Sequence, residues 1–134
     1  MSEVFADTAY WIALLNPRDD LHDAALGSAT ARTASQLVTS DLVLTELLNA
    51  FSGSAHLRSV AVQAVEALFG DARVIVEEQT REPFNAAIER YGARLDKTWS
   101  LTDCASMLIM ERRHMDDVLS SDHHFEQAGF RLAM

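Results

Sequence analysis

The chain has 134 residues, of which 49% are hydrophobic, so it can fold as one domain over residues 1–134, and a disordered chain is excluded. Twenty acidic residues stand against 11 basic ones, and the net charge of -9 argues against a general nucleic-acid binder, which is usually basic. The longest run without a polar break, Trp11 to Leu15, is too short to cross a membrane, so no membrane association is expected.

The N-terminus and the cysteine content predict a cytoplasmic protein. Glu3 and Asp7 occupy positions where a signal peptide carries Lys or Arg, so no export signal is expected. Cys104 is the only cysteine, which rules out a disulfide within one chain and agrees with a reducing compartment. We expect Cys104 to be a small buried hydrophobic residue.

Strand-like apolar runs alternate with helical patterns along the whole chain. The expected strands cover residues 4–7, 36–39, 73–76, 117–120 and 130–133. The expected helices cover residues 9–15, 20–33, 41–51, 55–69, 80–95 and 101–114. Several begin after a residue that can cap them: Thr8, Asp20, Ser40 or Asp41, and Ser100 with Asp103. This alternation predicts an α/β fold with a parallel, doubly wound sheet covered on both faces.

Four acidic residues stand in apolar or turn-like surroundings. Asp7 and Asp122 lie at the carboxyl ends of expected strands, where doubly wound sheets bind their ligands. Glu46 interrupts the apolar run 42–48, and Asp103 lies near the start of a helix. Lone carboxylates seldom settle among core residues unless they are paired, protonated or bound to a cation. The four acids therefore suggest one site, and an all-oxygen site favours Mg²⁺ or Mn²⁺.

Gathering four carboxylates has an electrostatic cost. Two unit charges about 4 Å apart repel by roughly 4 kcal/mol at an effective dielectric near 20. The acids therefore cannot all stay ionised without a cation, and otherwise the pKa of some of them must rise. A Mg²⁺ ion held by carboxylates can deprotonate a water and stabilise charge on a phosphodiester oxygen. The number of ligands allows one ion or two.

Three of the acids also have a purely structural explanation. Asp7 can cap the first helix, Asp103 can interact with a helix dipole, and Asp122 can be a turn residue or the cap of a helix at His123. Glu46 is harder to explain in this way, because most of its neighbours three and four positions away on the helix are apolar.

The loop before Asp103 carries Arg94, Lys97 and Trp99. Such a loop can hold an RNA phosphate and stack a base, and it can equally be an ordinary surface loop. The pair His123 and His124 invites a metal-binding interpretation. Adjacent residues on a helix point about 100° apart, so the two rings cannot readily share one ion, and we expect a structural role for them.

Four short motifs lie in an order and spacing typical of one protein family: residues 5–8 (FADT), 44–49 (LTELLN), 100–106 (SLTDCAS) and 121–130 (SDHHFEQAGF). With these motifs the chain resembles PIN-domain proteins over essentially its whole length. More narrowly, it resembles the VapC-type toxins of bacterial toxin–antitoxin pairs. The last motif is the most specific of the four.

The resemblance implies a three-layer α/β/α sandwich around a parallel sheet of four to five strands. It implies cleavage of single-stranded or loop RNA that depends on Mg²⁺ or Mn²⁺, with the metal held by Asp7, Glu46, Asp103 and Asp122. Thr8 and Ser121 match small hydroxyl positions that orient ligands or water. The expected partners are the RNA substrate, a second copy in a homodimer, and an antitoxin whose basic C-terminal segment places Arg or Lys in the acidic pocket.

Two other functions fit parts of the sequence. A PIN fold can act as a binding protein without catalysis. A phospho-accepting receiver domain is also small, acidic and Mg²⁺-binding, but it needs adjacent acids after the first strand and a Lys late in the chain. Asp7 has no acidic neighbour, and the last lysine, Lys97, precedes the late strands.

Overall fold

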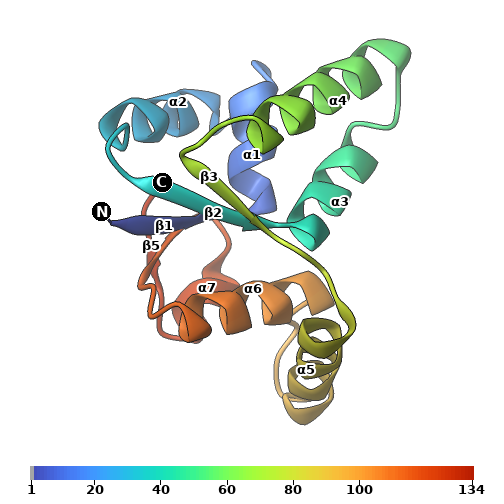
Figure 1. Ribbon diagram of the computed structural model, residues 1–134, viewed down its shortest axis with the longest axis vertical. Coiled ribbons are helices and arrows are strands. Elements are labelled where there is room, and N and C mark those ends of the chain that lie inside the picture. Colours follow the sequence, from blue (N-terminus) through green and yellow to red (C-terminus); the bar gives the residue numbers. More distant parts are fainter. Residues whose placement is uncertain (1) are drawn as a thin grey trace.

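Strands and helices alternate in the computed structural model, which describes residues 2–134 (Figure 1). The strands are β1 (Glu3–Ala6), β2 (Gln36–Ser40), β3 (Val74–Glu77), β4 (Asp117–Leu119) and β5 (Arg131–Leu132). The helices are α1 (Thr8–Leu15), α2 (His22–Ala31), α3 (Asp41–Ala50), α4 (Ala55–Phe69), α5 (Arg81–Ala93), α6 (Leu101–Arg112) and α7 (His123–Gln127). None of the helices in residues 2–134 is long and apolar enough to cross a membrane.

The five strands form one parallel sheet in the order β3-β2-β1-β4-β5. Helices α1 to α4 lie on one face of the sheet and α5 to α7 on the other (Figure 1). The structure thus confirms the predicted three-layer α/β/α sandwich around a parallel sheet.

Strand β1 is central because its side chains are apolar on both faces. Val4, Phe5 and Ala6 are almost completely buried, as expected for a strand covered by helices on both sides. From β1 the chain moves to β2 and β3 on one side, and it later returns to β4 on the other side. The carboxyl ends of β1 and β4 therefore flank the point where the strand order reverses, which is the usual ligand site of such sheets.

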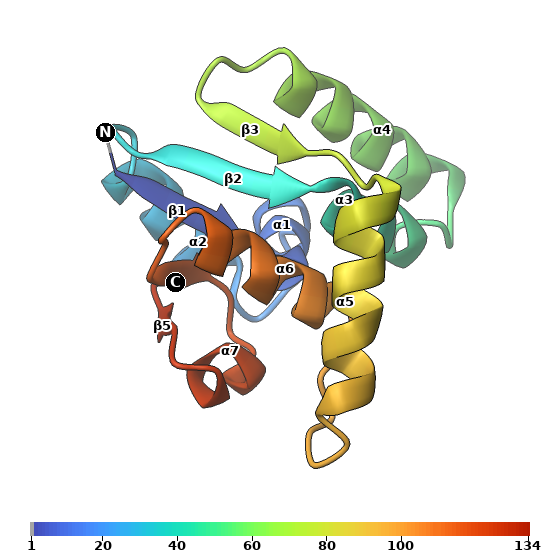
Figure 2. The same cartoon turned by 60° about the horizontal axis from the view of Figure 1, so that its bottom comes forward.

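The view in Figure 2 shows what surrounds this end of the sheet. The arrowheads of β2 and β3 point toward α3 and the start of α5, and α6 runs beneath the sheet. The first turns of α1, α3 and α6 directly follow β1, β2 and the loop 94–100. Side chains near these helix starts are therefore available to a common site.

Two predicted helix caps are wrong. The second helix begins at His22 and not at Asp20, because the preceding turn is closed by Asp19, whose Oδ1 accepts a hydrogen bond from the Leu21 backbone N–H (2.9 Å). Thr8 is the first residue of α1 and does not cap it, because its hydroxyl donates to a residue on α3. The caps Ser40 and Ser100 are confirmed.

Candidate active site

Asp7 occupies the position before α1, yet its side chain does not cap that helix. The carboxylate is 5% exposed, and its Oδ2 accepts a hydrogen bond from the Ser120 hydroxyl at 2.9 Å. Burial raises the pKa of Asp7 from its ordinary value of 3.8 to about 6, and the nearby charges of Asp103 and Glu46 push in the same direction. Asp7 therefore lies in a region short of positive charge.

Glu46 lies on α3, within reach of the start of α1. Its Oε1 accepts a hydrogen bond from the Thr8 hydroxyl at 2.5 Å. Thr8 directly follows Asp7, so this contact places the carboxylate of Glu46 beside that of Asp7, although α3 follows a different strand. The Thr8 hydroxyl, which the resemblance implies orients ligands or water, thus contacts a carboxylate of the candidate site.

Asp103 is held at the start of α6 by a capping box. Its Oδ2 accepts a hydrogen bond from the Ser100 backbone N–H (3.0 Å), while the Ser100 hydroxyl accepts one from the Asp103 backbone N–H (3.0 Å). The same Oδ2 lies 2.9 Å from Nδ1 of His124. The position of Asp103 at the start of α6 is therefore compatible with a role in the candidate site.

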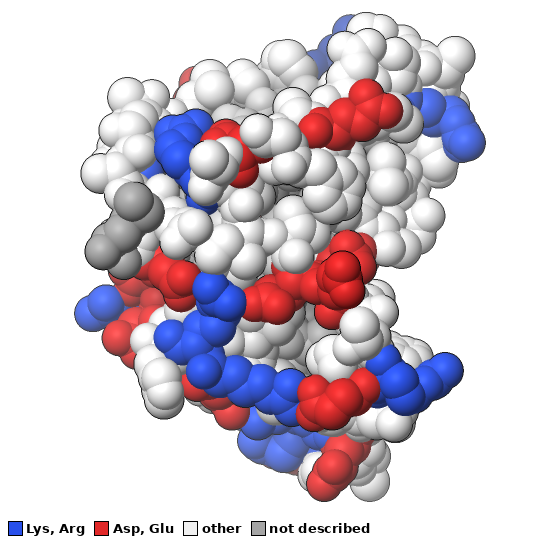
Figure 3. Space-filling view, in the orientation of Figure 1, with Lys and Arg blue, Asp and Glu red and all other residues white. Residues whose placement is uncertain are grey.

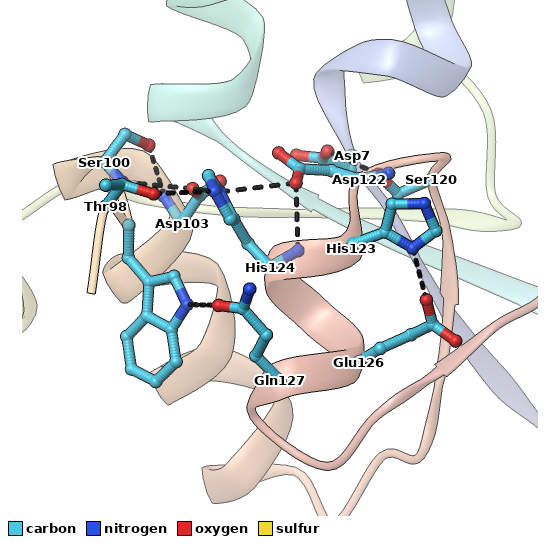
Figure 4. A network of polar contacts seen from close by, with 11 residues as sticks. Asp7, Thr98, Ser100, Asp103, Ser120, Asp122, His123, His124, Glu126 and Gln127 are labelled. Carbon is cyan, nitrogen blue, oxygen red and sulfur yellow. Dashed lines mark hydrogen bonds and ion pairs between the residues drawn. The ribbon is translucent and has the colours of Figure 1, made fainter. Parts of the chain in front are cut away.

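Asp122 caps α7 and also joins the other acids. Its Oδ1 accepts a hydrogen bond from the His124 backbone N–H at 2.9 Å. Its own backbone N–H donates to the Ser120 hydroxyl at 3.0 Å, and that hydroxyl in turn donates to Asp7. Figure 4 shows Asp7 and Asp122 side by side, with His124 between Asp122 and Asp103.

The acids lack a balancing cation. Within residues 2–134, no Lys or Arg pairs with Asp7, Glu46, Asp103 or Asp122. In three of the carboxylates, only one oxygen accepts hydrogen bonds from residues 2–134. The free oxygens are Oε2 of Glu46, Oδ1 of Asp103 and Oδ2 of Asp122. Unshared carboxylate oxygens in a charge-deficient site suit a hard divalent ion.

The hydroxyl that connects the acids comes from Ser120 and not from Ser121. Ser120 is buried, whereas Ser121 is exposed and its side chain makes no hydrogen bond in residues 2–134. The resemblance implies that Ser121 orients ligands or water, but the hydroxyl that contacts the acids in the structure is that of Ser120.

The loop before Asp103 differs from expectation at Trp99. The indole is only 7% exposed, its Nε1 donates to Gln127 at 3.0 Å, and the side chains of Arg94 and Lys97 lie over the ring at 4.9 and 5.8 Å. Arg94 also pairs with Asp96 at 3.0 Å. We therefore correct the expectation that Trp99 offers an open face for stacking a base, because it packs the loop against α7.

Most basic side chains of this protein are already paired with acids. Figure 3 shows Lys and Arg gathered over α5 and α6, interleaved with Asp and Glu. The pairs there include Arg90 with Glu111 and Arg112 with Glu82. Lys97 has no acidic partner in residues 2–134, so it is the basic residue of the loop that remains available to an anion.

His124 is the site residue that sequence reasoning missed. The structural role expected of the pair His123 and His124 agrees with the contact of His123, whose exposed ring pairs with Glu126 at 2.5 Å. His124 instead lies between Asp103 and Asp122. Its position two residues after a predicted site acid, at the start of a short helix, was the available signal.

Comparison with known proteins agrees with this geometry. The model of the PIN domain family matches residues 4–131, and the chain belongs to this family. The family assignment excludes the receiver-domain alternative.

Among the relatives are proteins of Mycobacterium tuberculosis, in two strains, described as the 23S rRNA-specific endonuclease VapC20. They are 31% identical to this chain over 133 residues, which cover 95% of each sequence. The crystal structure of VapC20, described as a toxin that cleaves the sarcin-ricin loop, matches with a TM-score of 0.86 and 26% identity. That match covers 97% of this chain and 98% of the other.

Proposed function

We propose that this protein is a VapC-like toxin, an endoribonuclease that cleaves RNA with the help of a divalent ion. The observation that supports it most is that four carboxylates share the switch point of the sheet without a compensating Lys or Arg in residues 2–134. The charges of Asp103 and Glu46 act on Asp7. His124 connects Asp103 to Asp122. The similarity to VapC20 over nearly the whole chain gives the reaction class.

The residues present fit Mg²⁺, with Mn²⁺ as a substitute, because the side chains around the site offer carboxylate oxygens. Asp7, Glu46 and Asp103 would hold the principal ion, and Asp122 would complete its site or hold a second one. When bound, the metal supplies positive charge that acidifies a water and stabilises the phosphodiester oxygens in the transition state.

The chain's own residues prepare this site. The Ser120 hydroxyl donates to one oxygen of Asp7, and the Thr8 hydroxyl donates to one oxygen of Glu46. These hydrogen bonds fix the direction of both carboxylates. Burial of Asp7 excludes water from one side, so the attacking water must enter from the open side of the cluster. Deprotonation of that water and in-line attack at phosphorus would then break one P–O bond of the phosphodiester, leaving one RNA end with a phosphomonoester and the other with a free hydroxyl.

The substrate proposed first is a loop of ribosomal RNA. The relatives are described as specific for 23S rRNA, and the matching crystal structure is described as that of a toxin that cleaves the sarcin-ricin loop. Lys97 would contact a phosphate near the site, since it lacks an acidic partner in the described chain. Arg94 would contribute less, because Asp96 already holds it.

We further propose the two protein partners expected of a VapC-like toxin. An antitoxin with a basic C-terminal segment would insert Arg or Lys among the uncompensated acids, where a guanidinium can bind carboxylates in a bidentate manner. A second copy of the chain would form a homodimer. The charge deficit around Asp7 supports the first partner directly.

The test is cleavage of a panel of structured RNAs, including the sarcin-ricin loop of 23S rRNA, with Mg²⁺, with Mn²⁺ and with EDTA. We expect cleavage at one loop that requires metal and is lost in Asp7→Asn. Absence of cleavage of every RNA, despite measured Mn²⁺ binding, would favour the non-catalytic PIN-fold binding protein instead.

A further inference from the structure

The imidazole of His124 makes three contacts that fix its orientation. Nδ1 lies 2.9 Å from Oδ2 of Asp103 and 3.3 Å from Oδ1 of Asp122. On the other side of the ring, Nε2 lies 3.2 Å from the Thr98 hydroxyl. The His124 side chain is 26% exposed: its contact with Asp103 is partly buried, whereas its contact with Thr98 is open to solvent.

The hydrogen on the ring can be assigned from these partners. In the ionised form needed for metal binding, Asp103 and Asp122 only accept hydrogen bonds, so Nδ1 of His124 carries the hydrogen in its contacts with them. A nitrogen that carries a hydrogen has no lone pair for a metal ion. The other nitrogen, Nε2, faces away from the acids and toward Thr98. One ligand atom each of Asp103, Asp122 and His124 lie within 4.8 Å of one another, so Nδ1 could bind an ion there only after losing its hydrogen.

The two carboxylate oxygens that Nδ1–H of His124 contacts each accept a second hydrogen bond, from a backbone N–H. Oδ2 of Asp103 also accepts from the Ser100 backbone, and Oδ1 of Asp122 also accepts from the His124 backbone. Both carboxylates are thus turned so that their second oxygen stays free of protein donors in residues 2–134. The ring joins two acids that come from different helices, α6 and α7, as Figure 4 shows.

The ring is itself anchored by the loop that precedes Asp103. Thr98 contacts Nε2, and the next residue, Trp99, donates to Gln127 at the end of α7. Two consecutive loop residues therefore hold α7 against the loop, one at each end of this short helix. Movement of the loop would turn the His124 ring and with it the two carboxylates.

We propose that His124 is a positioning residue that holds Asp103 and Asp122 in the orientation needed for metal binding, without being a ligand itself. This inference rests on the proposed metal-dependent function. Hydrogen-bond donors behind metal-binding side chains typically change metal affinity by about 10- to 100-fold when they are removed. We expect an effect of this size for the Nδ1–H of His124.

The chain allows a matched set of variants. In His124→Asn the amide nitrogen takes the place of Nδ1, whereas in His124→Gln it takes the place of Nε2, and His124→Ala has neither. We expect Mn²⁺ affinity, measured by electron paramagnetic resonance of free Mn²⁺, to stay within about threefold in His124→Asn and to fall about tenfold or more in the other two. The control is His123→Asn, which should leave affinity unchanged.

A second measurement separates positioning from ligation without RNA. In ¹⁵N-detected NMR spectra of the His124 ring, Nδ1 should keep its hydrogen after Mg²⁺ is added. Loss of that hydrogen on Mg²⁺ binding, or an equal loss of Mn²⁺ affinity in the Asn and Gln variants, would overturn the inference, as would a wild-type protein that binds no Mn²⁺.

These outcomes are independent of catalysis. If the Asn and Gln variants differ as expected but the wild type cleaves no RNA, the positioning role stands and the proposed nuclease function fails. Thermal unfolding in EDTA checks that each variant folds, and if His124→Ala does not, the Asn and Gln pair decides the question.

Discussion

The hydroxyl of Ser120 lies 2.9 Å from Oδ2 of Asp7, although the two residues are 113 positions apart in the sequence. The same hydroxyl oxygen accepts the backbone N–H of Asp122. One small buried side chain thus connects the acids at the ends of β1 and β4.

Replacing Ser120 by Ala should weaken the site. The change removes one hydrogen bond from the buried Asp7 carboxylate and the hydroxyl partner of the Asp122 backbone N–H. We therefore expect a loss of about 1–3 kcal/mol in the free energy of unfolding and at least about tenfold in Mn²⁺ affinity. Urea denaturation measures the free energy of unfolding, and Mn²⁺ titration measures the metal affinity. The exposed neighbour provides the control, since Ser121→Ala should change stability by no more than about 0.5 kcal/mol. Equal effects of the two variants would contradict the assignment of Ser120.

Thr8→Val should release Glu46. Valine keeps the shape of threonine but cannot donate to Oε1, so Glu46 would lose the contact that turns it toward Asp7. We expect Mn²⁺ affinity and the rate of RNA cleavage to fall about tenfold. Thr30→Val on α2 is the matched control, because its hydroxyl donates to a backbone carbonyl far from the site. No difference between the two variants would mean that Thr8 does not orient Glu46.

Asp7→Asn should abolish cleavage and leave the metal-free protein as stable as the wild type or more stable. Asparagine keeps the size of the side chain and removes a buried negative charge that no Lys or Arg in residues 2–134 balances. Cleavage assays with urea denaturation in EDTA test both parts, and Asp20→Asn, at an exposed turn, serves as the control. Strong destabilisation by Asp7→Asn would show that Asp7 has a structural role instead.

The metal-free protein should lose stability relative to Asp7→Asn as the pH rises. The pKa of Asp7 is about 6 in the folded state and lies near 3.8 without burial, so the folded state holds this proton more tightly. The resulting stabilisation is complete below about pH 4 and is lost as the pH passes through about 6. Two pKa units correspond to about 3 kcal/mol.

The measurement is the difference in free energy of unfolding between wild type and Asp7→Asn in EDTA, from pH 4 to pH 8. The comparison with the variant cancels the titration of the other carboxylates. With saturating Mg²⁺ the slope should shrink, because a cation favours the ionised form. A difference that stays flat across this range in EDTA would refute the raised pKa.

Arg113→Ala should destabilise the fold more than Arg112→Ala. The guanidinium of Arg113 pairs with Glu3 on β1 at 2.8 Å and with Glu77 on β3 at 2.5 Å, and these strands are not neighbours in the sheet. Arg112 pairs only with the exposed Glu82. We expect a loss of about 1–2 kcal/mol for Arg113 and under about 1 kcal/mol for Arg112 by thermal or urea unfolding. The reverse order would contradict a bridging role for Arg113.

The sheet and most helices could be predicted from the sequence because local signals agree with the fold. Helix α4 begins after Ser54, which caps it, and ends at Gly70, so its predicted bounds match those observed. The apolar run 4–6 is buried on both faces as a central parallel strand must be. Strand ends place Asp7 and Asp122 at the same edge of the sheet.

Features that depend on contacts between distant segments could not be predicted. The burial of Trp99 depends on Gln127, and the role of His124 depends on Asp103 and Thr98. The choice between Ser120 and Ser121 depends on which side of one extended peptide faces Asp7. Hydrophobic periodicity indicates whether a segment is a helix or a strand, but it does not give the direction of a single side chain at the end of that segment.

The strand order has a consequence for how the toxin-like chain is made. β1 leaves the ribosome first but pairs with β4, which is synthesised near the end, and the acids of the site come from both ends of the chain. A nascent chain that has not yet released β4 and α7 lacks Asp122, His124 and the strand that completes the site. The candidate site is therefore complete only when synthesis of the chain is almost finished.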